Sequence, residues 1–159
     1  MNKFLETTRR LLTVVHKRRC ILEQSLTGNS INLYPAQHRI LMELVKSPGA
    51  SQKELANMLQ VSGATMTNSI KKLIKSGYVV RYIKENDCRY NVLEITDSGR
   101  AVLQKSKIIF DKLDDVMFLG FSESDIDSFG KYLEKIYHNL SECSMERFNE
   151  EANKEVADS

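Results

Sequence analysis

The chain has 159 residues, of which 42% are hydrophobic and 28% are charged, and its net charge is +2. Glycine and proline together number only nine, so a β-sandwich or β-barrel is disfavoured and a helical fold is favoured. The longest apolar run has four residues (116–119), far below the roughly 18–20 that a membrane-spanning helix needs.

Cysteine usage and the first residues indicate a cytoplasmic protein. The cysteines, Cys20, Cys88 and Cys143, are too widely spaced for a disulfide framework or a Cys-rich zinc motif. The amphipathic opening contains Glu6 and two arginines, so a secretory signal is not expected. No metal site and no cofactor are predicted.

The charge is unevenly distributed along the chain. Residues 1–20 include six basic residues and one acidic residue, and residues 51–95 include seven basic and four acidic residues. Residues 141–159, in contrast, include two basic and six acidic residues. Such asymmetry is compatible with a nucleic-acid partner or with an ordinary solvated surface.

Helical spacing dominates the first half of the chain. Apolar positions predict a helix over 3–24, and Pro35 suits the first turn of a second one. Ser51 opens a capping box at the start of a short third helix. A break follows, and then Ser62 is the expected N-cap of a fourth helix that Gly77 ends.

The pattern then changes to strands and back. Residues 78–83 and 90–95 predict a β-hairpin, and helices are expected again from Thr96 and from Ser122. Residues 149–159 carry no apolar stripe and are expected to be frayed or disordered. The fold class is therefore mainly α with one β-hairpin, in the order of a winged helix-turn-helix.

This order suggests three regions before the tail. Residues 1–30 would form a dimerisation helix, 34–98 a winged helix-turn-helix head, and 99–148 further dimerisation helices. The apolar stripes of the first and last helices are too wide for one small head to cover. We therefore expect them to pack together and against a second copy of the chain.

The fourth helix has one face that the core leaves free. Small side chains at its start would let it approach base edges in a major groove, hydroxyls and the helix N-terminus suit phosphates, and Asn68 could pair with adenine. The alternative is an ordinary solvated helix face. The expected DNA-binding residues on this helix are Ser62, Gly63, Ala64, Thr65, Thr67, Asn68, Lys71 and Lys72.

The hairpin tip is the second candidate DNA contact. Lys84, Asn86 and Arg89 could reach a minor groove or flanking phosphates, and Asp87 would orient an arginine. A hairpin turn of mixed charge is the alternative.

Taken together, the motifs resemble the MarR family of bacterial regulators. The resemblance rests on Pro35-Ala36-Gln37, Glu54-Leu55-Ala56, Thr65-Met66-Thr67, Gly77-Tyr78-Val79-Val80-Arg81, Asp87-Cys88-Arg89 and Ile95-Thr96-Asp97-Ser98-Gly99. It implies a homodimer with two winged heads that binds a palindromic operator in double-stranded DNA, usually as a repressor. It also implies release by a small aromatic or lipophilic effector that enters a cleft between the dimer helices and each head.

Two positions depart from the family pattern. Tyr34 stands where an N-capping Ser or Thr is usual, and Cys88 replaces a second wing arginine. By position, the candidate effector-pocket residues are His16, Cys20, Tyr34 and His38. Each has packing or surface exposure as its alternative role.

Other chemistries are disfavoured. Cys20 lies later in its helix than the cysteine of peroxide-sensing relatives, and His38 lies one position before the site that zinc-sensing relatives use. The chain has no phosphate-binding loop, nucleophile elbow or His-Glu metal motif, so no enzyme activity is expected. The alternative function is a winged-helix protein–protein adaptor without specific DNA binding.

Overall fold

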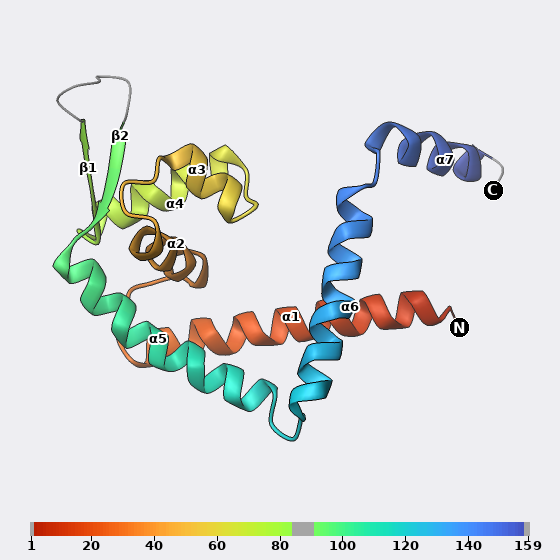
Figure 1. The fold of residues 1–159 in the computed structure, drawn as a ribbon, viewed down its shortest axis with the longest axis horizontal. Helices are drawn as coiled ribbons and strands as arrows, with labels where there is room; N and C mark the ends of the chain where they lie inside the picture. Colours follow the sequence, from red (N-terminus) through yellow and green to blue (C-terminus); the bar gives the residue numbers. More distant parts are fainter. Residues whose placement is uncertain (1, 84–90, 158–159) are drawn as a thin grey trace. The chain divides into compact units, whose positions relative to one another are not determined.

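The computed structural model describes residues 2–83 and 91–157. Its first compact unit spans Met1–Val116 and its second Met117–Ser159 (Figure 1). The elements that start in the first unit are α1 (Lys3–Gly28), α2 (Pro35–Lys46), α3 (Gln52–Met58), α4 (Gly63–Lys75), β1 (Val79–Ile83), β2 (Asn91–Ile95) and α5 (Asp97–Met117). This order confirms the predicted fold class: mainly α, with one antiparallel hairpin in a winged helix-turn-helix head.

The head is built around the apolar face of α4. Met66, Ile70 and Leu73 fall at i, i+4 and i+7, and all three are fully buried. They pack beside α2 and α3, whose Leu41 and Leu55 are also fully buried. This apolar contact fixes which side of α4 is left for solvent.

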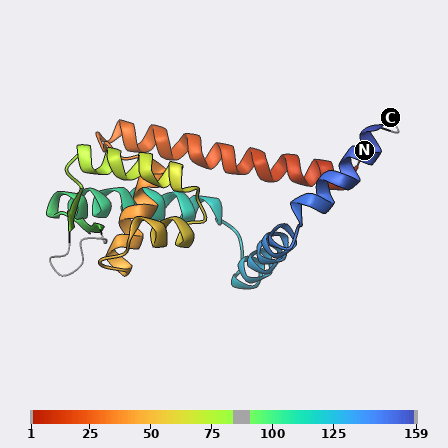
Figure 2. The same ribbon diagram turned by 90° about the horizontal axis from the view of Figure 1, so that it is seen from above.

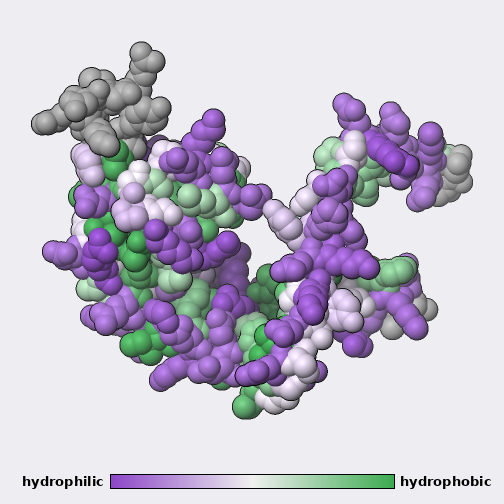
Figure 3. Space-filling model, in the orientation of Figure 1, coloured by the Kyte–Doolittle hydropathy of each residue, from purple (hydrophilic) through white to green (hydrophobic). Residues whose placement is uncertain are grey.

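Helix α1 is buried only at its C-terminal end. Leu22 and Leu26 are in the core, whereas Phe4 is 83% and Leu12 63% exposed. Figure 2 shows the N-terminal half of α1 extending away from the head. Hydrophobic side chains also reach the surface along α5 (Figure 3), where Ile108 is exposed.

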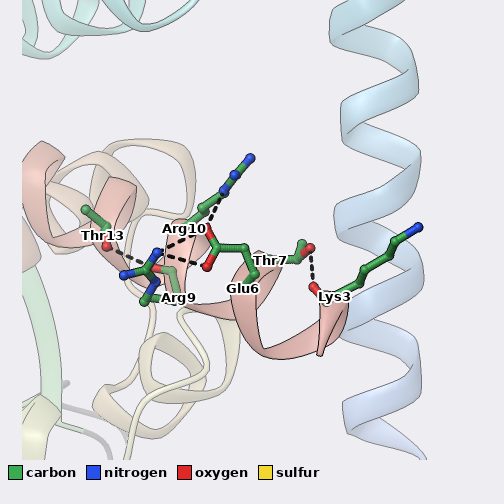
Figure 4. A network of polar contacts seen from close by, with 6 residues as sticks. All are labelled: Lys3, Glu6, Thr7, Arg9, Arg10 and Thr13. Carbon is green, nitrogen blue, oxygen red and sulfur yellow. Dashed lines mark hydrogen bonds and ion pairs between the residues drawn. The ribbon is translucent and has the colours of Figure 1, made fainter. Parts of the chain in front are cut away.

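The start of α1 partly neutralises its own positive charge. Glu6 accepts hydrogen bonds from Arg9 at 2.8 Å and from Arg10 at 2.9 Å (Figure 4). The hydroxyl of Thr7 donates to the carbonyl of Lys3, one turn earlier. Since Arg18 and Arg19 pair with Asp114 and Glu23, four of the six basic residues within 1–20 have an acidic partner.

The junction between the hairpin and α5 is tightly packed. Gly77 has φ +73°, the left-handed conformation expected of a residue that ends a helix. Its carbonyl oxygen lies 2.7 Å from the hydroxyl of Thr96 and 2.8 Å from that of Ser98. A side chain at Gly99 would collide with the carbonyl oxygen of Tyr78, so only glycine lets α5 approach the hairpin this closely.

The second unit contains α6 (Glu123–Ser141) and α7 (Met145–Ala157). Ser122 caps α6 as predicted, because its hydroxyl accepts a hydrogen bond from the backbone of Asp125 at 3.2 Å. Phe118 makes edge contacts with Phe121 and Phe129. The remaining large apolar side chains of α6 are exposed, among them Leu133, Ile136 and Leu140.

The prediction of a frayed tail was wrong for residues 149–157, which belong to α7. Glu, Ala, Lys and Arg are strong helix formers, and Arg147 pairs with Glu151 one turn later at 3.2 Å. The side chain of Ser144 also faces the backbone N–H of Arg147 at the start of the helix. These local contacts stabilise a helix that has no buried residues.

Among the described residues, no helix combines the length and the apolar character that crossing a membrane requires.

Candidate nucleic-acid interface

Helices α3 and α4 form the helix-turn-helix, and each begins with a serine cap. The hydroxyl of Ser51 accepts from the backbone of Glu54 at 3.2 Å, and the Glu54 carboxylate accepts from the backbone of Ser51 at 2.7 Å. The Glu54 carboxylate has a lowered pKa because it accepts hydrogen bonds from Ser51, chiefly from the backbone N–H. Gln60 makes the turn between the helices with φ +53°, and Ser62 then caps α4 by accepting from the backbone of Thr65.

The outer face of α4 presents most of the predicted DNA-binding residues to solvent. Seven of the eight are exposed: Ser62, Gly63, Ala64, Thr65, Asn68, Lys71 and Lys72. They lie opposite the buried Met66, Ile70 and Leu73. The surface therefore combines a helix N-terminus, small side chains, hydroxyls, one amide and two ammonium groups.

Thr67 differs from the other seven residues. Its side chain is half-buried, and its hydroxyl lies 2.8 Å from the carbonyl of Gly63 and 2.5 Å from the amide nitrogen of Gln52. The oxygen of the same Gln52 amide accepts from Arg81 on β1 at 3.1 Å. Sequence reasoning missed Gln52 and Arg81, because nothing local in the sequence indicates a contact across 29 residues.

The predicted wing contacts Lys84, Asn86, Asp87 and Arg89 lie outside the described residues, as does Cys88. The described part of the hairpin pairs Val79 with Ile95 and Tyr82 with Val92. Val79 and Arg81 share one face of β1, and Val79 is buried against the head. The base of the hairpin is therefore fixed to α4, as a wing requires.

The four effector-pocket candidates do not share one cavity. Cys20 and His16 lie one turn apart on α1, with Sγ 3.5 Å from Nε2. Tyr34 and His38 line two different hollows of the first unit. Among residues 2–83 and 91–157, no three His, Cys, Asp or Glu side chains are grouped as a metal ion would need.

Tyr34 lines a cavity of about 360 Å³ between α1, the start of α2 and α4. It gives α2 no side-chain cap, in line with the departure from the family pattern, although Gln37 accepts a hydrogen bond from its backbone N–H at 2.9 Å. The ammonium group of Lys72 lies 5.2 Å from the centre of the Tyr34 ring, within cation–π range. Lys72 is thus shared between this cavity and the outer face of α4.

His38 is buried and lines a cavity of about 490 Å³. Its Nδ1 lies 2.8 Å from the hydroxyl of Ser106, which donates its own hydrogen to the carbonyl of Leu103. With the Ser106 hydrogen directed to that carbonyl, Nδ1 is the protonated nitrogen and Nε2 is a hydrogen-bond acceptor, which has no partner among the described residues. Burial lowers the pKa of His38 to about 4, so the ring is neutral at pH 7.

The walls of the His38 cavity are mixed in character. The acidic side chains there are paired: Asp114 with Arg18, Glu43 with Lys46, and Asp111 with Lys107. Arg39 forms no ion pair with any described residue. The apolar part of the lining is contributed by Met42, Met58, Leu59 and Phe110.

Comparison with known proteins shows which protein family the head of this chain matches. The family model "MarR family" matches residues 33–90, which contain α2 to β1. The winged helix-turn-helix head of this chain therefore matches the MarR family. Since members of this family are transcription regulators, this agrees with the expectation that the chain is not an enzyme.

Individual MarR-family relatives extend the match. The HTH-type transcriptional regulator BilQ of Clostridium symbiosum is 29% identical over 91 residues, which cover 57% of this chain and 63% of that regulator. A solved MarR protein from Peptoclostridium difficile is 28% identical to this chain and has a TM-score of 0.74. The match covers 84% of this chain and 86% of that protein. The Staphylococcus aureus MepR–DNA complex has a TM-score of 0.77 at 20% identity, with 87% of this chain covering 99% of that one.

Proposed function

We propose that this chain is a DNA-binding transcriptional regulator of the MarR family that places α4 in the major groove. The observation that carries the proposal is the division of α4 into a buried apolar face and an exposed face of small, hydroxyl, amide and ammonium side chains. A helix of this kind at the edge of a helix-turn-helix can approach base edges closely. That MepR, which shares the fold, has been solved with DNA supports the proposal.

We further propose that the regulator acts as a homodimer on a palindromic promoter site, as a repressor. Exposed apolar side chains on α1 and on α6 support this, since a second copy could cover them. Two heads related by a two-fold axis would read two half-sites of one palindrome. Lys84, Asn86, Asp87 and Arg89 would supply the wing contacts on each side.

The test is fluorescence anisotropy of the full chain on DNA from upstream of its own gene, across a salt series. We expect one dimer per site, an affinity that falls steeply as salt rises, and weak binding to a scrambled duplex. Loss of transcription from that promoter in a purified system would establish repression. Weak binding without sequence preference would overturn the proposal and favour the protein–protein adaptor.

The effector site that the geometry favours is the His38 cavity. It has the size of small-molecule sites, and within residues 2–83 and 91–157 neither the acceptor Nε2 of His38 nor the Arg39 guanidinium has a partner. These groups suit a small aromatic molecule that carries a hydroxyl donor and an anionic group. The cavity is lined from α1, α2, α3 and α5, so its occupant would contact the helix that precedes α4.

Release of DNA by a series of phenols and aromatic carboxylates tests this assignment. His38→Phe keeps a flat ring beside Phe110 but removes the acceptor. We expect the variant to bind DNA as the wild type does and to lose release by hydroxylated aromatics. Equal release from both proteins would place the effector elsewhere, with the Tyr34 cavity as the next candidate.

A further inference from the structure

Three side chains that are far apart in the sequence form one continuous hydrogen-bonded chain in the head. Arg81 of β1 donates to the amide oxygen of Gln52, the first residue of α3, at 3.1 Å. The amide nitrogen of Gln52 lies 2.5 Å from the hydroxyl oxygen of Thr67 on α4. The Thr67 hydroxyl reaches the carbonyl of Gly63, the first residue of α4, at 2.8 Å.

The direction of donation along this chain is fixed by its chemistry. Arginine can only donate, so the group that faces Arg81 must be the Gln52 oxygen. The Gln52 nitrogen therefore faces Thr67 and donates to it. Thr67 accepts at its oxygen and uses its single hydrogen for Gly63, so each amide and hydroxyl group in the chain has one suitable partner.

We infer that Gln52 is a positioning residue that couples β1 to the first turn of α4, and so sets the base preference of the protein. This inference rests on the proposed function. Arg81 is exposed and uses one of its five N–H donors here, and no other described residue takes up its remaining donors, which suit a phosphate. The series of hydrogen bonds ends at Gly63, in the first turn of α4. This turn carries the small residues that are expected to face the bases.

The coupling predicts an effect on specificity rather than on overall affinity. Thr67 is half-buried and its hydroxyl is used within the protein, so its contribution to DNA binding is through the orientation of α4. Removal of one link frees the first turn to shift against the groove. Contacts to phosphates made elsewhere are unchanged, and they dominate binding to unrelated DNA.

The experiment compares Gln52→Met, Thr67→Val and the double variant with wild type. All are neutral changes of similar size, and Thr67→Ser is the matched control because it keeps the hydroxyl. Anisotropy is measured on the operator, selected with wild-type protein from a random duplex library, and on a scrambled duplex of equal length. Thermal unfolding of each variant confirms that it is folded.

We expect each single variant to lower the ratio of operator to scrambled affinity by about tenfold, the effect of one hydrogen bond. Binding to the scrambled duplex should stay within about twofold, the double variant should be no worse than either single one, and Thr67→Ser should match wild type. If Gln52→Met weakens both duplexes equally and Thr67→Val changes neither, Gln52 is itself a phosphate contact and the inference is overturned. A wild-type protein without sequence preference would overturn the proposed function instead, and this inference with it.

Discussion

The imidazole of His38 stacks on the ring of Phe110, with centroids 3.8 Å apart and planes 10° from parallel. The two residues come from α2 and α5, so the pair joins the head to the helix that follows the hairpin. Arg18 of α1 lies 5.7 Å from the centre of the same Phe110 ring and pairs with Asp114 at 3.0 Å. Three helices of the first unit therefore meet at this neutral histidine.

The stability of the first unit should depend on pH through His38. Desolvation lowers its pKa from 6.5 to about 4, against the opposing effect of Asp111 and with smaller contributions from Lys107 and Arg18. Between these values the unfolded chain binds a proton that the folded chain does not, so stability is complete above pH 6.5 and is lost as the pH falls toward 4. We expect a loss of about 2–3 kcal/mol in urea unfolding across that range.

His38→Phe provides the control for this pH dependence. The variant keeps a stacked ring but has no titrating group, so its stability should fall less steeply between pH 6.5 and pH 4 than that of the wild type. An identical slope in both proteins would show that other groups cause the acid sensitivity.

Gly99→Ala should destabilise the protein severely. The added Cβ would collide with the carbonyl of Tyr78 and lie 2.8 Å from Cγ1 of Ile95, so α5 would have to move away from the hairpin. We expect a loss of about 3 kcal/mol or more in thermal or urea unfolding. Gly28→Ala is the matched control, since nothing lies within 4 Å of its Cβ position, and it should be neutral or slightly stabilising. Comparable stability of the two variants would contradict the close approach.

Lys71→Ala should weaken binding to operator and scrambled DNA to a similar extent. Lys71 is exposed on α4 and forms no ion pair with a described residue, so it is available to neutralise a phosphate. The slope of log affinity against log salt should fall by about one for each subunit contact that is lost. Lys131→Ala, on the exposed surface of α6, should leave the slope unchanged. A change confined to the operator would make Lys71 a base contact.

Asn68→Ala should relax base preference at one position of each half-site. The exposed amide can form two hydrogen bonds with adenine, and such a pair is worth about 1–3 kcal/mol of discrimination. Anisotropy on operators with each base at that position measures the effect. A uniform loss on every duplex would assign Asn68 to the phosphate backbone.

Leu133→Asp should dissociate the proposed dimer, because it places a charge in the apolar stripe of α6. Sedimentation measures the change in mass, and far-ultraviolet circular dichroism shows whether the helices are retained. Asn139→Asp makes the same change of charge on α6 outside the apolar stripe and should remain dimeric. A folded Leu133→Asp dimer would exclude this part of α6 from the interface.

Local features of this fold could be predicted from the sequence, and long-range ones could not. Ser51, Ser62 and Ser122 were identified as caps because a cap acts within three or four residues of its own position. His38 contacts Ser106, which lies 68 positions later in the sequence, and Gln52 contacts Arg81, which lies 29 positions later. No spacing rule indicates either contact. Helix α7 cannot be predicted from apolar periodicity, because its stabilising features are helix-forming residues and the Arg147–Glu151 pair rather than a buried stripe.

The carbonyl of Gly77 accepts hydrogen bonds from the hydroxyls of Thr96 and Ser98, and so connects the end of α4 to the start of α5. It lies two residues beyond the end of α4 and is held by the residues that begin α5, so neither helix can tilt there without moving the other. Helix α5 continues from this junction to Met117 and passes the His38 cavity on the way. A displacement of α5 beside Phe110 would therefore act on the C-terminal end of α4 through these two hydrogen bonds.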